Sequence, residues 1–134
     1  MKPCGRLLGL IVLASVAVVT GLTLPPALAQ TVDPQSLVGQ WAGTWAMTNE
    51  PGIQGTHNMT ISKVDGNQVF GHVDRIGVGR AVATVHFDFV GTLDGDRLTF
   101  AGPAHTVELT ISGTDMRGTG FESLHFNVAM AKTK

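Results

Sequence analysis

Histidine is the residue type in this sequence with the clearest chemical potential. Near neutral pH a histidine side chain can take up a proton, release one or bind a metal ion. The histidines do not follow the H-x-x-x-H or H-x-H spacing that places two metal ligands on one face of a helix or strand. The sequence therefore predicts no metal site and no cofactor among its five histidines, His57, His72, His86, His105 and His125.

One of these histidines belongs to a polar row that alternates with phenylalanines. His86 and Asp88 are two residues apart, so they share one face of an extended strand, and Thr84 lies on that face as well. We interpret the row as solvated sheet surface. A weak surface metal site would become available if a neighbouring strand brought His125 alongside it.

The sequence contains few features that would support a catalytic role. The single cysteine, Cys4, lies near the N-terminus, and no G-x-S-x-G motif occurs. The glycine-rich segment 77–80 lacks the following helix that a phosphate cradle needs, so it is interpreted as a connection between strands. Whether the protein is an enzyme stays uncertain; the sequence favours a non-catalytic role and assigns no catalytic residues. The best acid–base candidates are His57 and His72, near the ends of two expected strands.

The first 29 residues are typical of a signal peptide. Lys2 and Arg6 precede the apolar stretch 7–19, and Ala27 and Ala29 provide small residues at positions −3 and −1 of a cleavage site. The apolar stretch is shorter than the roughly 20 residues of a membrane-spanning helix. We therefore expect cleavage after Ala29, no membrane span afterwards, and a single domain over residues 30–134 in the periplasm or outside the cell.

The charge of the mature chain argues against nucleic acid as a partner. The whole chain has a formal net charge of −1, and loss of Lys2 and Arg6 with the leader makes the remainder more acidic. The other lysines and arginines are spread along the chain, so no basic patch is expected. Asp74 and Arg75 are interpreted as an exposed ion pair or as charges at the end of a strand. The mature chain lacks cysteine, so its stability must come from packing without disulfides.

Short alternating segments separated by glycine-containing turns predict an all-β fold. Asp65-Gly66, Asp94-Gly95 and Ser112-Gly113 each separate two strand-like segments, as in β-hairpins. About eight such strands fit into the mature chain, and an open sheet of them would leave two edges unpaired. The expected architecture is an antiparallel meander barrel of about eight strands. A membrane-spanning barrel is disfavoured because the strands are short and the chain has no tyrosine for an aromatic girdle.

Alternation also divides the strand residues between two faces. The expected polar outer face includes Thr60, His86, Asp88, Glu108 and His125. The residues expected inside the barrel are Met59, Ile61, Val85, Phe87, Phe89, Leu93, Leu98, Phe100, Val107, Leu109, Ile111, Leu124, Phe126, Val128 and Met130.

The first expected strand contains Gly39-Gln40-Trp41, and Gly-x-Trp is repeated as Gly43-Thr44-Trp45. This pattern resembles the first strand of the calycin superfamily, which includes lipocalins and avidins. The resemblance implies that Gly39 and Trp41 form a structural plug at one end of the barrel. Trp45, which has the same parity, would face the lumen. A periplasmic protease inhibitor with a similar Gly-x-Trp strand implies an alternative, in which residues 30–35 form an inhibitory arm.

A binding role is the favoured interpretation. An eight-stranded barrel is just wide enough to be filled by side chains or to hold one small ligand. We expect a small hydrophobic ligand, with a protein partner, as for an inhibitor, as the alternative and a small isomerase or cyclase as the second alternative. The loop 48–55 is expected to cover the mouth of the barrel. The expected ligand-binding residues are Trp45, Ile53, Met59, Phe87, Phe89 and Met130.

Overall fold

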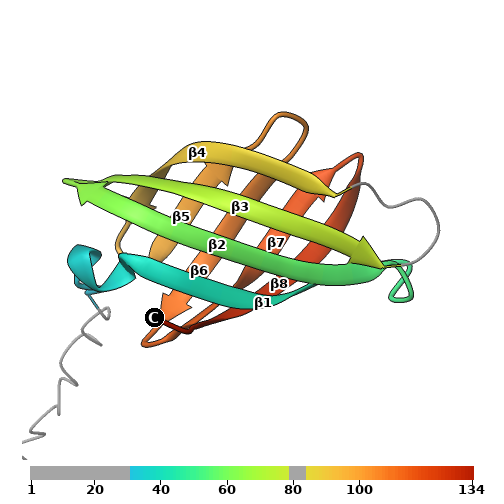
Figure 1. The fold of residues 1–134 in the computed structure, drawn as a ribbon, viewed down its shortest axis with the longest axis horizontal. Coiled ribbons are helices and arrows are strands. Elements are labelled where there is room, and N and C mark those ends of the chain that lie inside the picture. The colour runs from blue at the N-terminus through green and yellow to red at the C-terminus, as the bar shows by residue number, and fades with distance from the viewer. Residues whose placement is uncertain (1–30, 79–83) are drawn as a thin grey trace, which may run out of the picture.

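The computed structural model describes residues 31–78 and 84–134 (Figure 1). The expected signal peptide and its cleavage site, together with Gly79 and Arg80 of the glycine-rich segment, lie outside the described residues. Gly77 and Val78, the first two residues of that segment, belong to a strand.

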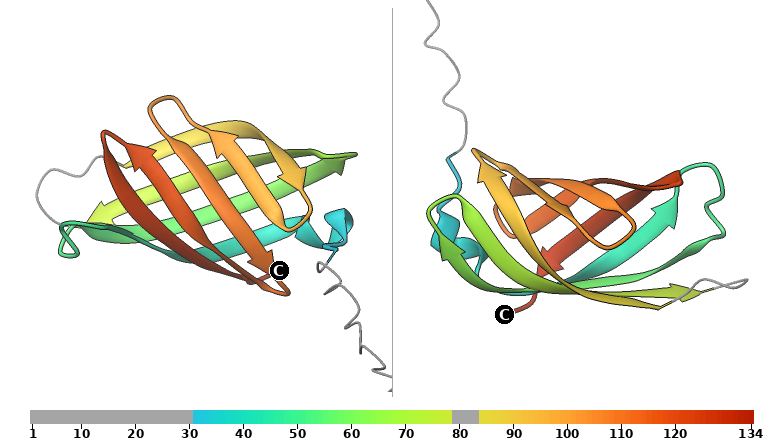
Figure 2. Two further views of the ribbon diagram at one scale, coloured as in Figure 1. Left: turned by 180° about the vertical axis from the view of Figure 1, so that it is seen from behind. Right: turned by 90° about the horizontal axis from the view of Figure 1, so that it is seen from above.

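Eight antiparallel strands form a closed barrel in which each strand pairs with the next one along the chain, and the last pairs with the first (Figures 1 and 2). The expected all-β meander barrel is therefore confirmed. A short 3-10 helix, η1 (Pro34–Leu37), precedes the strands. They are β1 (Gly39–Met47), β2 (Gln54–Asp65), β3 (Gln68–Val78), β4 (Val85–Asp94), β5 (Arg97–Ala101), β6 (Thr106–Ser112), β7 (Asp115–Glu122) and β8 (Leu124–Lys132).

Three tight turns gather at one end of the barrel, which we call the capped end. Gly66, Gly95 and Gly113 occupy these turns with φ of 60°, 61° and 60°. Glycine is favoured there because a side chain strains this left-handed conformation. The η1 helix lies at the same end (Figure 1). The opposite end, the loop end, holds the connections β1–β2, β5–β6 and β7–β8.

The η1 helix is attached to the capped end by apolar packing and by side-chain hydrogen bonds, including one from Lys132 Nζ to the Ser36 carbonyl oxygen at 2.5 Å. The Leu37 side chain is buried, and its carbonyl oxygen accepts a hydrogen bond from Trp41 Nε1 at 2.9 Å. Gln35 Nε2 donates to the Val64 carbonyl oxygen at 3.1 Å. Within the described residues, no helix has the length and apolar character needed to cross a membrane.

Most of the residues expected inside the barrel are buried there, but Leu124 and Val85 are not fully enclosed. Leu124 is 47% exposed, so its expected place in the core is wrong. It follows Ser123, whose φ of 54° makes a tight turn between β7 and β8. The parity of Leu124 is correct, but the residue lies at the rim of the barrel, beyond the core. Val85 is partly buried at the start of β4 and packs against the core.

The wall of the barrel is least complete between β4 and β5. These strands share three residue pairs, from Thr92↔Thr99 to Asp94↔Arg97, all near the capped end. The preceding part of β4, residues 85–91, is paired with β3. Within the described residues, the part of β4 nearest the loop end therefore has a hydrogen-bonded neighbour on one side alone.

Candidate functional site

Three polar side chains are buried inside the barrel near the loop end. His57 on β2 is 0% exposed, Arg75 on β3 is 3% exposed, and His105 in the β5–β6 connection is 4% exposed. His57 and Arg75 are direct cross-strand partners, so their side chains enter the lumen next to each other. We call these three residues, with Glu122 of β7, the lumen cluster.

Arg75 is the only buried arginine or lysine in the described part of the chain. Its Nη2 donates to Glu122 Oε2, which forms an ion pair across the lumen. Its guanidinium carbon lies 4.9 Å from the ring centre of Trp45 and 5.1 Å from that of Phe126. Both rings stabilise the cation through their π electrons. The Nε and Nη1 atoms of Arg75 have no hydrogen-bond partner in the protein.

Phe126 reaches this position because the residue opposite it is glycine. Gly120 pairs with Phe126 across β7 and β8. A Cβ atom at residue 120 would lie 2.1 Å from Phe126 Cζ, so any side chain there would displace the ring. The ring also packs edge-on against Trp45, with 6.2 Å between centroids. Gly120 therefore shapes the aromatic surface that Arg75 contacts.

The surroundings favour the neutral form of both buried histidines of the lumen cluster. Burial, followed by the positive charge of Arg75 and by repulsion from His105 when it is protonated, lowers the pKa of His57 from 6.5 to about 4. Burial and then Arg75 also lower the pKa of His105, although Glu122 opposes that shift. The His105 ring packs edge-on against Phe87, with 4.7 Å between centroids.

Five buried nitrogen atoms of the cluster lack a protein partner. A buried polar atom without a hydrogen bond costs about 1–3 kcal/mol, so such atoms normally bond to ordered water or a ligand. A neutral imidazole offers one donor and one acceptor, and a guanidinium offers donors alone. The cluster can therefore hold a polar or acidic group inside the barrel. The five atoms are His57 Nδ1 and Nε2, Arg75 Nε and Nη1, and His105 Nε2.

Some of the expected ligand-binding residues border this cluster. Trp45 contacts Arg75 through its ring, and its Nε1 donates to the Ile76 carbonyl oxygen at 3.2 Å. Phe87 packs on His105. Ile53, in the β1–β2 connection, is partly buried and packs against the core.

The other expected ligand and plug residues lie deeper in the barrel or at its capped end. Met59 is the cross-strand partner of Trp41, Met130 pairs with Met116, and all four side chains are buried. Phe89 stacks on Phe100 with 4.2 Å between centroids. Gly39 has a φ of 137°, and a Cβ there would lie 2.1 Å from the Lys134 carbonyl oxygen. Packed core therefore surrounds Met59, Phe89 and Met130, whereas the unpartnered polar atoms lie near the loop end.

Sequence reasoning missed Arg75. The interpretation of Asp74 and Arg75 as an exposed pair is wrong, because neighbouring residues of a strand point to opposite faces. Arg75 has the same parity as Val69 and Val73, both fully buried, and this alternation was the available signal. The charge of Arg75 concealed its inward position.

The two candidate acid–base residues are separated by the barrel wall. His57 lies inside the barrel, whereas the His72 side chain is on the outer face of β3 and is partly exposed. They cannot act on one substrate atom. Among the five histidines, the structure brings His57 and His105 together in the lumen and His72 and His86 together on the outer face.

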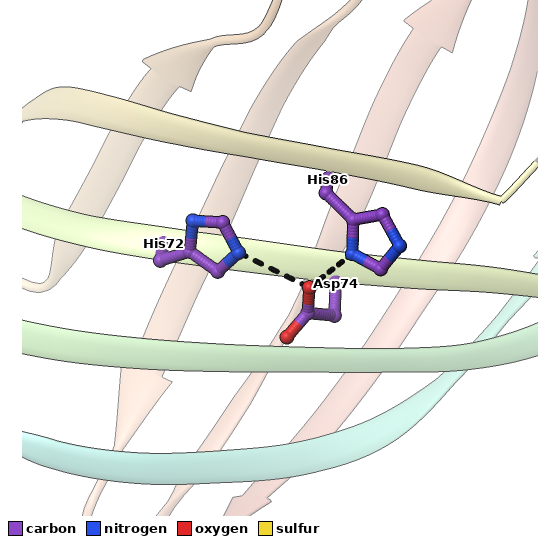
Figure 3. Close-up of side chains that lie close together, drawn as sticks. All are labelled: His72, Asp74 and His86. Atoms are coloured by element: carbon purple, nitrogen blue, oxygen red, sulfur yellow. Dashed lines mark hydrogen bonds and ion pairs between the residues drawn. The ribbon is translucent and has the colours of Figure 1, made fainter.

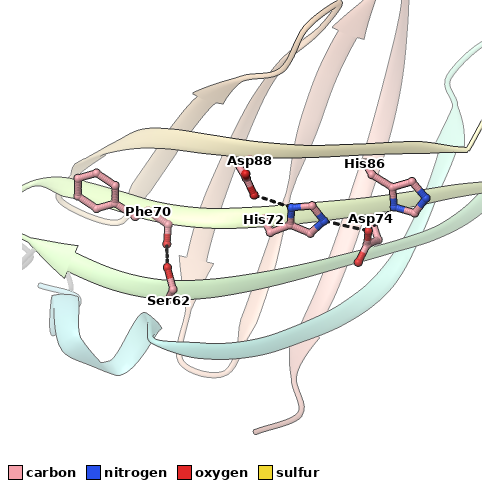
Figure 4. Close-up of polar contacts among 6 residues, drawn as sticks. All are labelled: Ser62, Phe70, His72, Asp74, His86 and Asp88. Carbon is pink, nitrogen blue, oxygen red and sulfur yellow. Dashed lines mark hydrogen bonds and ion pairs between the residues drawn. The ribbon is translucent and has the colours of Figure 1, made fainter.

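The outer quartet consists of His72 and Asp74 on β3 with His86 and Asp88 on β4 (Figures 3 and 4). Asp74 Oδ1 bonds to His72 Nε2 at 3.1 Å and also to His86 Nδ1. Asp88 Oδ1 lies 2.7 Å from His72 Nδ1. The hydrogen bond to Asp88 is the main cause that raises the pKa of His72, and the bond to His86 is the main cause that lowers the pKa of Asp74.

His125 does not join this group, contrary to the condition that the sequence left open for a surface metal site. It lies on β8 next to Phe121, with 4.9 Å between ring centroids. The partner of this part of β4 is β3, and β8 pairs with β1 and β7.

Two comparisons with known proteins complete the description of the site. A scan against protein-family models found no match to this chain. A search of curated proteins found no matching protein either.

Proposed function

We propose that this protein binds a small amphipathic molecule at the loop end of its barrel. The observation that carries the proposal is the buried Arg75, whose Nε and Nη1 lack partners beside the unpartnered nitrogens of His57 and His105. The ligand would place an acidic head group on these donors and its apolar part against Trp45 and Phe87. This refines the small hydrophobic ligand expected from the sequence.

The chemistry of the lumen cluster favours a carboxylate or a similar anion. A guanidinium forms strong charge-assisted hydrogen bonds with carboxylates and stays charged at all physiological pH values. Glu122 neutralises Arg75 when no acid is bound, and its side chain is 32% exposed. Glu122 can therefore turn towards water when a ligand carboxylate replaces it.

We expect a ligand to reach the cluster from the loop end. Glu122 and His105 lie at or next to the connections of this end. The short pairing of β4 with β5 adds a second route, because residues 85–91 of β4 border the lumen beside Phe87 without a described partner strand on that side. Local opening there would break few main-chain hydrogen bonds.

The proposal includes the calycin-like character of the barrel and its place outside the cytoplasm. The closed eight-stranded meander and the buried Trp41 near the start of β1 support the first. The signal-peptide pattern of the first 29 residues supports the second. A protease-inhibitor role has less support, because Val32 packs on the core and Gln35 bonds to Val64 in the segment that would serve as a free arm.

The test combines native mass spectrometry with ligand titration. Protein purified from the envelope of its host should carry an acidic adduct that organic extraction removes. Binding to the extracted protein is measured by tryptophan fluorescence. Decanoic acid should bind at least about tenfold more tightly than decanol, because a hydrogen bond to a charged group contributes about 1.5–3 kcal/mol.

The matched variants are Arg75→Met and Arg117→Met. Removal of one partner of a buried ion pair is destabilising, but the Glu122 side chain is 32% exposed and can turn towards water, so Arg75→Met should still fold and should lose the preference for the acid. Arg117 is exposed on β7, so Arg117→Met serves as the control and should bind the acid like the wild type. Equal acid binding by both variants, or absence of acid binding and of any adduct in the wild type, would overturn the proposal.

A further inference from the structure

The outer quartet is a second polar site, separated from the lumen by the barrel wall. Its four side chains alternate in type across two strands: His72 is opposite Asp88, and Asp74 is opposite His86. The two residues opposite them on β2 are Thr60 and Asn58, which carry no charge. The histidines are therefore the only titratable partners that these two carboxylates contact within the described residues.

The two close contacts of the His72 ring with carboxylates require a positive charge, either a proton on the ring or a metal ion beside it. Both ring nitrogens of His72 face carboxylate oxygens, at 2.7 Å from Asp88 and 3.1 Å from Asp74. A neutral imidazole has one N–H group, so it can donate to one of these oxygens while its other nitrogen would oppose a second lone pair. A proton on His72 removes this conflict, and so does a metal ion between His72 Nε2 and Asp74.

We propose that His72, Asp74 and His86 bind a zinc ion on the outer face of the barrel. The atoms His72 Nε2, Asp74 Oδ1 and His86 Nδ1 converge (Figure 3), and one ligand atom from each residue lies within 4.8 Å of the others. Ligands of a tetrahedral zinc ion lie about 2.0–2.2 Å from the metal, so small side-chain rotations bring the three atoms into range. Two imidazoles and a carboxylate are a donor set that suits zinc.

Asp88 is the positioning residue of this site. With zinc on His72 Nε2, the remaining N–H at Nδ1 donates to Asp88 (Figure 4). This carboxylate–histidine–metal arrangement sets the tautomer and the orientation of the ring. A water molecule would complete the zinc coordination, because the side chains of His72, Asp74 and His86 are all partly exposed to solvent.

The experiment is a calorimetric titration of zinc chloride into chelator-treated protein that carries no histidine tag. The wild type should bind one zinc ion per chain. Asp74→Asn and His86→Gln should each weaken binding by more than tenfold, and Asp88→Asn by about tenfold, as removal of an outer-shell partner typically does. His125→Gln, which removes an exposed histidine on β8, should leave the affinity unchanged.

A nitrogen NMR spectrum of the histidine rings provides a second measurement. Zinc should shift His72 Nε2 and His86 Nδ1 while His72 Nδ1 keeps its proton. Absence of saturable binding in the wild type, or equal affinity in the wild type and in folded Asp74→Asn and His86→Gln, would overturn the proposal. Circular dichroism establishes that these variants are folded, and the exposure of all four side chains makes this the expected result.

Discussion

The buried histidine of the lumen cluster should make the protein sensitive to acid. His57 is 0% exposed, and its pKa falls from 6.5 to about 4 in the folded protein. Between these values the unfolded chain binds a proton that the folded chain does not, so stability falls as pH decreases. The contribution of His57 is complete above pH 6.5 and is lost as the pH falls towards 4.

The magnitude follows from the same two pKa values. At 1.36 kcal/mol per pKa unit, the full effect is about 3 kcal/mol, and about 2 kcal/mol of it is lost by pH 5. This is a substantial fraction of the roughly 5–15 kcal/mol by which a folded domain is typically stable. With a urea slope of about 1 kcal/mol per M, the midpoint of unfolding would move by about 2 M between pH 7 and pH 5.

The assay is urea unfolding followed by the fluorescence of the buried tryptophans Trp41 and Trp45, at a series of pH values. In His57→Gln the titrating group is absent while hydrogen-bonding capacity remains, so its stability should fall by about 2 kcal/mol less than that of the wild type between pH 7 and pH 5. The difference between the two proteins cancels the other titrating groups. His125→Gln, at an exposed position, should follow the wild type. Parallel pH curves for wild type and His57→Gln would refute the reasoning.

Three further substitutions test how the barrel is packed. Gly120→Ala should destabilise by about 1–3 kcal/mol in urea unfolding, because its methyl group displaces the Phe126 ring; an unchanged midpoint would mean that the ring can move freely. Trp41→Phe should lose the hydrogen bond to the Leu37 carbonyl oxygen and speed amide exchange in η1, and unchanged exchange would show that this hydrogen bond does not hold the helix in place. Leu124→Ser should change stability by less than about 0.5 kcal/mol, as exposed positions do; a loss comparable to that of a core residue would restore the inward assignment.

Local sequence patterns were sufficient to predict the architecture of the barrel. Alternation assigned Phe87, Phe89 and Val128 to the interior because a strand has a period of two residues. Gly66 and Gly95 located their turns because few other residues tolerate a left-handed conformation. Eight such segments in a short chain favour closure, since a closed barrel has no unpaired edge.

Local sequence patterns misplaced residues where the polarity of a side chain disagreed with its position in the strand alternation. Arg75 and His57 have inward parity, but single polar residues in a strand are ordinarily expected on the solvent side. Their burial depends on partners from distant parts of the chain. Glu122 provides the countercharge and Phe126 an aromatic surface, and neither is close in sequence to Arg75.

The sequence by itself determined the strands, the turns and the alternation of side chains between two faces, because these depend on neighbouring residues. The tertiary structure alone decided which of those faces meet. The register of β3 with β4 places Asp74 between His72 and His86, and a shift of one residue would separate them. Closure of β1 on β8 encloses the lumen in which Arg75 meets Glu122. Both outcomes depend on pairing between distant segments, so they are properties of the closed barrel as a whole.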